Sequence, residues 1–588
     1  MRIADSSLPY ESTIRNPKSE MVNVNLEMEN TRSVMLPSTQ FAIQLIGPDQ
    51  LRLVEDKPVD RPGPYQVLAR VEAVGLCFSD LKLLKQFSDH ARKSEVLSGI
   101  DGAVLPEIPS YRPGTLPTVP GHEAVCQVVA VGNKVRHSKV GQRVLVQTDY
   151  RWLPTSKSNA AFGYNFEGAL QQYVLMDERV IVDPQTDEGF LIPVSDGLSA
   201  SAVALIEPWA CVESSYVTAD RNRFLAGGRL LVVAEAGRQV RGLDQGLDPK
   251  GQPGSVTACC AEPRQIKAVR RLSVPVAEVA GIDHLTGQVF DDIVYFGADK
   301  HVIEVLNDRL APSGIINIVL GGQRIARPVS VGVGRVHYGL TRWIGTTGTD
   351  ASESYRVIPP NGEIRDGERA VVFGAAGPMG QMHVIRLVCA GKKGVSVVGT
   401  DVDPVRLENL SAKARPLADR NGVALELVDT KARPLEGTFG YFAIMVPMGA
   451  MVEQAVRLSS DRALINVFAG IPSDVRQDLD LDRYIANHGY MFGTSGSRLI
   501  DMKIVLDKVT SGQLDTNVSV DAVSGMAGAI DGIRAVENRT MSGKIIVYPS
   551  LTDMPLTPLG RLTQTHPAVA AKIHGGLWTK AAEETLLR

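Results

Sequence analysis

The pattern of hydrophobic and polar positions divides the 588 residues into a polar stretch, a region of short strands and two α/β segments. Residues 1–36 are polar and aperiodic, which predicts an N-terminal extension. Three β-branched runs follow, separated by Gly, Pro and Asn, as in a small irregular β-barrel: QVLARVEAVGL, VCQVVAVG and QRVLVQ. The Pro- and Gly-rich stretch from Gln86 to Pro120 is too long for a simple connection. LSASAVALIEPWACVESSYVTA then predicts a helix that leads out of this region.

The two α/β segments repeat one another in order and spacing. RLLVVAEAG (Arg229 to Gly237) matches RAVVFGAAG (Arg369 to Gly377), and the segments close with IGTTG and FGTSG. Phe290 to Gly348 spans 58 positions, and Phe439 to Gly496 spans 57. The same strand-helix rhythm could arise in any two βαβ stretches, but the paired ends favour a duplicated Rossmann-like unit.

The second copy carries a dinucleotide-binding pattern, because an apolar strand enters the Gly-rich turn GAAGPMG, which opens a helix. Gly374 suits the tight turn, Gly377 lets backbone approach a pyrophosphate, and Gly380 allows close packing of helix on strand. Asp401 follows Gly380 by 21 residues, where a carboxylate binds the ribose 2′-hydroxyl and disfavours a 2′-phosphate. The pattern therefore predicts NAD over NADP, although Arg406 nearby could accept NADP. Further cofactor contacts are predicted at Pro378, Met379, Thr494 and Ser495.

The first copy has lost this pattern. Ala234 stands where the second copy has Gly374, and Val240 stands where it has Gly380. Only Gly237 remains, and the stretch up to the second strand, which ends near Glu262, is loop-like. We expect this degenerate copy to pack or pair with a partner and to bind no nucleotide. Cys259 and Cys260 in its second strand are expected to be core residues.

Three separated pieces of the chain carry metal-ligand chemistry. GLCFSD offers Cys77, Ser79 and Asp80, PGHE offers His122 and Glu123, and ALIEPWA offers Glu207. Catalytic zinc takes three ligands from Cys, His and carboxylate side chains and keeps one position open. Each piece alone is a weak signal, and together they predict one zinc site.

The order of these motifs, with the Gly-rich turn downstream, resembles the zinc-dependent medium-chain dehydrogenase/reductase family. The resemblance is strongest to its polyol branch, which includes sorbitol dehydrogenase and sorbose-1-phosphate reductase types, and covers Gln40 to Tyr216 and Gly367 to Pro549. It implies a GroES-like irregular β-barrel catalytic domain joined to Rossmann-like parallel sheets. Two features depart from the family: 45 residues separate Cys77 from His122, and no cysteine lies between Gly141 and Tyr173 to build a structural zinc lobe.

The resemblance also assigns roles. Cys77 and His122 would bind catalytic zinc, and Glu123 or Glu207 would ligate it directly or through its water. Ser79 would relay the alcohol proton, and Asp80 would orient the ligand histidine. Bound zinc would polarise the substrate oxygen while hydride passes between the substrate carbon and NAD(H). The implied partners are a small alcohol or ketone substrate and further copies of the chain, as a dimer or tetramer.

Patterns and resemblance together imply an α/β protein that works as a zinc-dependent oxidoreductase, transferring hydride between NAD(H) and a secondary alcohol or ketone. The resemblance and the glutamate expected as third ligand imply that the substrate is a polyol, sugar or sugar phosphate. The alternatives are a zinc-free quinone or enoyl reductase on the same scaffold and a non-catalytic binding protein. The predicted domains are 1–36 (extension), 37–216 (catalytic), 217–354 (degenerate Rossmann-like unit), 355–510 (NAD-binding unit), 511–550 (return to the catalytic domain) and 551–588 (C-terminal tail).

Composition and charge argue against several classes of partner and location. A net charge of −3 gives no reason to expect nucleic acid or an anionic membrane as partner. No apolar run approaches about 18 residues, and the N-terminus has no secretory pattern. Six cysteines without a CxxC pair favour a reducing cytoplasm. Basic residues that could bind a substrate phosphate, each more simply explained as part of a solvated loop, are His90, Arg92, Lys93, Arg112, Arg151 and Lys157.

Overall fold

The computed structural model describes residues 36–244 and 251–588. The chain divides into two compact units, Met1–Pro37 and Ser38–Arg588. The expected extension, residues 1–36, lies outside the described residues except for Leu36. Among the described residues, no helix has the length and apolar composition needed to cross a bilayer.

The barrel region forms an eight-stranded sheet around a buried core. β3 (Gln66–Gly75) lies at its centre, between β4 (Glu123–Val131) and β27 (Lys544–Val547), so residues far apart in the sequence share one sheet. Its other strands are β5 (Arg143–Val146), β8 (Tyr173–Asp177), β11 (Leu191–Pro193), β26 (Val520–Ser524) and β28 (Thr557–Pro558). Separate two-stranded pairs are β1 (Thr39–Gly47) with β2 (Gln50–Pro58), β6 (Asp149–Pro154) with β7 (Asn159–Ala161), and β9 (Val182–Asp183) with β10 (Glu188–Gly189).

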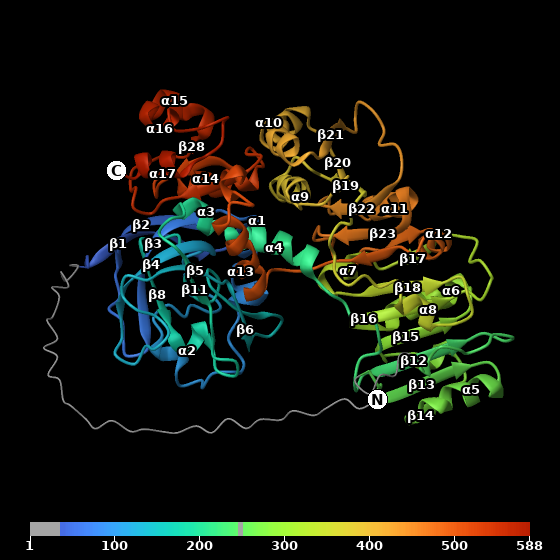
Figure 1. The fold of residues 1–588 in the computed structure, drawn as a ribbon. Coiled ribbons are helices and arrows are strands. Elements are labelled where there is room, and N and C mark those ends of the chain that lie inside the picture. Colours follow the sequence, from blue (N-terminus) through green and yellow to red (C-terminus); the bar gives the residue numbers. More distant parts are fainter. Residues whose placement is uncertain (1–35, 245–250) are drawn as a thin grey trace, which may run out of the picture. The chain divides into compact units, whose positions relative to one another are not determined.

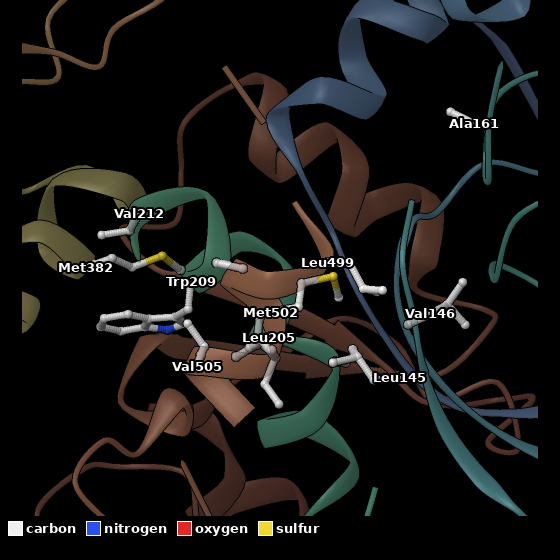
Figure 2. Packing of buried hydrophobic residues seen from close by; sticks show 14 of the residues in the cluster. Leu145, Val146, Ala161, Leu205, Trp209, Val212, Met382, Leu499, Met502 and Val505 are labelled. Carbon is white, nitrogen blue, oxygen red and sulfur yellow. The ribbon is translucent and has the colours of Figure 1, made fainter. Parts of the chain in front are cut away.

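The single helix expected after the barrel is two helices, α3 (Ala200–Ala204) and α4 (Ile206–Val217). Pro208 explains the break, because its ring clashes with the carbonyl four residues earlier and its nitrogen has no proton to donate. In Figure 2, Leu205, Trp209 and Val212 along this stretch lie beside Met502 and Val505 of α13 (Leu499–Thr510) and Met382 of α9 (Pro378–Val388). These side chains belong to one continuous apolar core.

A second sheet of twelve strands runs as one stack from β14 to β21 in Figure 1. One half has the order β14-β13-β12-β15-β16-β18 and the other the order β21-β20-β19-β22-β23-β25. Within each half the strands are parallel, in the 3-2-1-4-5-6 order of a doubly wound dinucleotide fold. The first-half strands are β12 (Arg229–Ala234), β13 (Ser255–Cys260), β14 (Val276–Glu278), β15 (Phe290–Phe296), β16 (Leu310–Val319) and β18 (Arg342–Thr346). The second-half strands are β19 (Arg369–Phe373), β20 (Ser396–Asp401), β21 (Ala424–Asp429), β22 (Phe439–Ile444), β23 (Ser459–Val467) and β25 (Tyr490–Phe492).

The two halves join edge to edge. β18 and β25 pair antiparallel at Trp343 and Met491, and β17 (Val329–Val331) pairs antiparallel with β24 (Gln477–Leu479). Both halves carry a register shift at the same place, after Phe290 in β15 and after Phe439 in β22. Each half thus covers the edge strand of the other, which removes two exposed sheet edges.

Helices cover both halves, with one difference. The first half has α5 (Pro263–Val269), α6 (Lys300–Arg309), α7 (Gly334–Tyr338) and α8 (Ser352–Tyr355), and the second has α9, α10 (Pro404–Asn421), α11 (Gly449–Leu458) and α12 (Leu481–Ala486). After β19 the chain enters α9 directly, but the described residues between β12 and β13 contain no α-helix. Val240 therefore does not stand where a helix closes on its strand, as the sequence suggested; the whole helix is missing from the described residues there.

The final segment, expected as a tail, is folded. It contains α15 (Leu562–Thr565), α16 (Pro567–Ala570) and α17 (Lys580–Leu586), and α14 (Ala529–Glu537) precedes it. Trp578 is buried and donates a 3.0 Å hydrogen bond to Tyr548 Oη. The Glu583 carboxylate accepts from the backbone of Ala200 and Ser201 at the start of α3, so the C-terminal helices are fixed to the catalytic region.

Candidate active site

Cys77 lies at the junction of β3 and α1 (Phe78–Gln86), where it is the N-cap residue of the helix. Its backbone N–H donates to Asp80 Oδ2 over 3.1 Å, which fixes the turn. Its Sγ lies 3.1 Å from Ser79 Oγ. The thiol and hydroxyl predicted from GLCFSD therefore adjoin one another, at a half-buried position.

His122 and Glu123 lie at the start of β4. Gly121 before them has φ +95, and a side chain there would meet Leu170 at 2.9 Å, so this turn requires glycine. His122 is buried, and its Nδ1 lies 2.9 Å from Asp80 Oδ1. With Nδ1–H donating to Asp80, Nε2 is left to ligate a metal. Burial opposes protonation of His122, but the Asp80 carboxylate outweighs it and raises the pKa of the ring above its ordinary value.

One ligand atom from each of Cys77, His122 and Glu123 lies within 4.8 Å of the other two. Glu123 Oε1 accepts an ion-pair hydrogen bond from Lys544 Nζ, while Oε2 is buried and has no partner among the described residues. A thiol, an imidazole and a carboxylate oxygen within 4.8 Å of one another fit the donor set of catalytic zinc.

Glu207, the remaining predicted ligand, lies outside this group. It is buried near the start of α4, and Cys211 Sγ lies 3.7 Å from its Oε1. Burial raises the pKa of Glu207 to about 7; the His122 charge opposes this rise, and the charges of Glu123 and Asp149 add to it. Glu207 therefore interacts electrostatically with His122 and Glu123 but is not a member of the Cys77–His122–Glu123 group.

The second half of the twelve-stranded sheet contains the Gly-rich turn. Gly374 has φ +76, and a side chain at Gly380 would overlap the backbone of Gly374 and Ala375. A side chain at Gly377 would meet nothing closer than 3.8 Å, so its surface is open to a ligand. Gly377 also caps α9 without a side-chain hydrogen bond, which leaves the first N–H groups of that helix available to a phosphate. Pro378 and Met379, both half-buried, form the first turn of α9.

Asp401 and Arg406, expected at the ribose, face different partners. Asp401 is the last residue of β20, and its Oδ2 accepts a 3.1 Å hydrogen bond from the N–H of Ala376 in the Gly-rich turn. Arg406 donates to the carbonyls of Arg539 and Met541, at 2.6 and 3.3 Å. The carboxylate is therefore at the turn, and the guanidinium is already engaged elsewhere.

Thr494 and Ser495 follow β25 at the carboxyl edge of the same half. The Oγ1 of Thr494 is buried and has no partner among the described residues, whereas Ser495 is exposed. Arg342 of the first half donates to the carbonyl of Gly493 next to them over 2.9 Å.

In the first half, the equivalent turn is closed by its own side chains. Glu262 accepts a 2.7 Å hydrogen bond from the N–H of Gly237, and Arg238 donates to Leu320 and Gln323. The Cys259 thiol is buried and Cys260 is half-buried in β13, as expected for core residues. None of the six cysteines, which all lie among the described residues, forms a disulfide.

The basic residues considered for phosphate mostly have internal partners. Arg92 forms a 3.1 Å ion pair with Asp149, and Arg151 donates to the carbonyl of Ser497 over 2.9 Å. Lys93 is fully buried and donates to the carbonyls of Arg112 and Leu116. Arg112 lies 3.9 Å from Glu167, His90 is half-buried, and Lys157 is exposed.

Two residues at the site were not predicted from the sequence. Lys544 belongs to β27, 421 positions after Glu123, and nothing in KIIV distinguishes this lysine from a solvated one. Tyr164 is buried with its ring 5.7 Å from that of His122 and 5.1 Å from that of His90. A buried tyrosine in an irregular loop also carries no local sequence signal.

Residues 63–185 match the alcohol dehydrogenase GroES-like domain. Over these residues the chain therefore carries the GroES-like domain of the medium-chain zinc alcohol dehydrogenase family.

Curated relatives are distant. The chain is 24% identical over 344 residues to L-sorbose 1-phosphate reductase from Klebsiella pneumoniae, covering 54% of this chain and 77% of the relative. It is 26% identical over 272 residues to the uncharacterized protein YggP from Escherichia coli, covering 41% of this chain and 62% of that relative's length. A solved structure of L-idonate 5-dehydrogenase from Escherichia coli aligns with 87% of this chain and 98% of its own, at 10% identity and a TM-score of 0.45.

Proposed function

We propose that this protein is a zinc- and NAD(H)-dependent dehydrogenase that interconverts a secondary alcohol and a ketone. The observation that carries the proposal is the convergence of Cys77, His122 and Glu123 in a chain whose Gly374–Gly380 turn can hold a dinucleotide. A polyol, sugar or sugar phosphate is the proposed substrate class, supported by the similarity to L-sorbose 1-phosphate reductase. A zinc-free reductase would have no use for this ligand group.

Each residue of the candidate site has its own role in the proposed reaction. Cys77, His122 and Glu123 would hold zinc, which when bound polarises the substrate oxygen. Asp80 holds the Nδ1 proton of His122 and thereby keeps Nε2 free, and Lys544 fixes the Glu123 carboxylate through one oxygen. Glu207, outside the group, would act through a water molecule.

Ser79 would begin the proton path from the alcohol, because its Oγ lies 3.1 Å from Cys77 Sγ and is half-buried. The turn from Gly374 to Gly380 and the first turn of α9 would bind the pyrophosphate of NAD, which supplies or accepts hydride. Asp401 would bind the ribose, and Thr494 and Ser495 would line the nicotinamide end.

We also propose that 217–354 and 355–510 are two copies of one Rossmann unit and that only the second binds dinucleotide. Equal strand order and the matching register shifts support the duplication. The described residues between β12 and β13 contain no α-helix whose first N–H groups could bind a pyrophosphate. Residues 37–216 and 511–550 then form the catalytic domain, since β26 and β27 join the barrel sheet.

The test is a screen of purified, zinc-loaded protein against sugar alcohols with and without a phosphate, following NADH absorbance. We expect NAD-dependent oxidation of at least one polyol or polyol phosphate. Absence of turnover with every substrate, by a protein that binds zinc and NADH, would contradict the proposed substrate class. If the protein bound neither zinc nor NADH, the proposed enzymatic function would be contradicted and a non-catalytic binding protein would be favoured.

A further inference from the structure

Tyr338, the last residue of α7, connects the first half of the large sheet to two other parts of the chain. Its Oη accepts a 3.0 Å hydrogen bond from Lys82 Nζ of α1 in the catalytic domain. Its ring also lies against Gly470, which follows β23 at the carboxyl edge of the second half, so closely that a side chain at Gly470 would overlap it. The ring of the preceding residue, His337, lies 6.2 Å from that of Phe468. The degenerate half therefore reaches the edge where the dinucleotide turn lies.

Lys82 lies on α1, the helix that Cys77 of the proposed metal centre caps. It follows Ser79 by three residues on α1, and side chains at that spacing are neighbours on one face of a helix. Phe78, at the first position of the same helix, is 51% exposed, so this end of α1 is open to solvent. Burial is the main cause that lowers the pKa of His90 and of His337, and the Lys82 charge is a further cause for both, although the two histidines belong to different parts of the chain.

Lys82 has no ionic partner. Among the described residues, no carboxylate lies within 4.0 Å of its Nζ, and its one hydrogen bond is to Tyr338. One turn further along, Lys85 lies 2.6 Å from Asp49 and also pairs with Glu537. Arg92 and Arg112, the nearest basic candidates of the loop, already face carboxylates. Lys82 is thus the exposed ammonium at this end of the site that keeps its charge uncompensated.

Resting on the proposed function, we propose that Lys82 and Tyr338 bind an anionic substituent of the substrate, a phosphate ester or a carboxylate, at the end remote from the reacting carbon. A lysine ammonium has three N–H donors, of which Tyr338 uses one, and the Tyr338 hydroxyl has its own proton to donate. An oxyanion can accept from both groups at once. The first half of the sheet then completes the substrate site, although it binds no dinucleotide.

The test compares Lys82→Gln and Tyr338→Phe with wild type on D-sorbitol, D-sorbitol 6-phosphate and D-gluconate. We expect wild type to prefer one of the two anionic substrates. The ratio of kcat/KM for that substrate to kcat/KM for D-sorbitol should fall at least tenfold in Lys82→Gln and about threefold in Tyr338→Phe, since a neutral amide loses the charge and a phenyl ring loses one donor. Lys85→Gln is the matched control, with the same charge change on the same helix, and should leave the ratio unchanged. The preferred anion, phosphate or carboxylate, identifies which of the two the site receives.

Calorimetric titration of inorganic phosphate into the holoenzyme gives a readout that needs no turnover. We expect the phosphate Kd to rise at least fivefold in Lys82→Gln and to stay at the wild-type value in Lys85→Gln. Unchanged phosphate affinity in Lys82→Gln together with an unchanged substrate ratio would overturn the anion site. A wild type that turns over no polyol but loses phosphate affinity in Lys82→Gln would contradict the proposed function and leave the anion site supported.

Discussion

At the scale of single residues, the arrangement of Cys77, His122 and Glu123 depends on a glycine beside them, Gly75. Gly75 and Glu123 are partners across β3 and β4, and a methyl group at Gly75 would overlap Glu123 Oε2. Because Gly75 has no side chain, the unpartnered Oε2 of Glu123 can occupy this space. GLCFSD includes this glycine for a steric reason that becomes visible only when β4 is placed beside it.

Gly75→Ala should weaken zinc binding by about tenfold, about 1.4 kcal/mol, because it displaces the Glu123 carboxylate. Competition with a fluorescent chelator measures the affinity. Gly189→Ala is the control, since a side chain there meets nothing within 4 Å. Equal zinc affinity in the two variants would contradict a ligand role for Glu123.

Cys77→Ser should remove both zinc and activity while the fold survives, because Cys77 contributes a ligand from the solvent-accessible start of α1 and not from the core. Metal analysis and circular dichroism check the two parts separately. A Cys77→Ser protein that retains zinc and turnover would remove the thiol from the ligand set.

The position of Asp401 predicts a preference for NAD over NADP of at least about tenfold in kcat/KM, or about 1.4 kcal/mol. The carboxylate lies at the turn, and the Arg406 guanidinium is held by two backbone carbonyls. Asp401→Ala should reduce this preference for NAD over NADP. Equal use of both cofactors by wild type would mean that Arg406 leaves its carbonyl partners and binds the 2′-phosphate.

The sequence alone pointed to most of these residues, because each candidate ligand belongs to a short motif whose backbone turn fixes its position. Cys77, His122 and Glu123 were predicted in this way. Lys544 was not, because its contact with Glu123 joins positions 421 apart and depends on how β27 enters the barrel. Glu207, predicted from EP at the start of a helix to bind zinc directly or through water, lies outside the group of three, and its role stays a prediction.

At the scale of elements, the two Gly-rich turns of the large sheet lead into different structures. The second enters α9 at once, whereas the first leads into described residues without an α-helix and is closed by Glu262 and Arg238. Ala234 and Val240 indicated from sequence that the first half differs from the second, and in the described residues the difference is a connection without an α-helix, not a clash at Val240.

Gly377→Asp should abolish NADH binding, because its side chain would occupy the open surface that a pyrophosphate needs and would repel it. Gly237→Asp should leave binding unchanged; Gly237 has φ +79, a conformation that Asp tolerates better than most residues. Fluorescence titration with NADH separates the two. If only Gly237→Asp lost NADH binding, the dinucleotide site would lie in the first half and not in the second.

Element boundaries were less predictable than element types. The helix expected after the barrel breaks into α3 and α4 before Pro208, and the expected tail forms helices held by Trp578 and Glu583. Neither Trp578 nor Glu583 has a local partner, so periodicity in the sequence could not show that residues 551–588 dock on the catalytic region.

At the scale of the whole second unit, one chain builds the twelve-stranded sheet from both of its halves. Because β18 covers the edge strand β25, a homo-oligomer of the kind that the family resemblance implies would have to use another surface. Tyr484 bridges the junction: its hydroxyl donates to the carbonyl of Trp343 over 2.7 Å and accepts from the N–H of Met491 over 2.9 Å.

Tyr484→Phe should lower the free energy of unfolding by about 1–3 kcal/mol, since it removes two buried hydrogen bonds to backbone groups at the junction. Urea denaturation measures the change. Tyr338→Phe, which removes a hydroxyl at the surface, should change the unfolding free energy by less than about 0.5 kcal/mol. Identical stability of the two variants would mean that the halves do not depend on this bridge.

The most direct test of the account is the zinc content and NAD-dependent activity of the purified protein before chelation, after chelation and after zinc is restored. We predict about one zinc per chain, consistent with the single group formed by Cys77, His122 and Glu123 among the described residues. Activity should disappear with the metal and return with it, while circular dichroism stays constant. Full activity in the metal-free protein would contradict the assignment of these residues to a catalytic zinc centre.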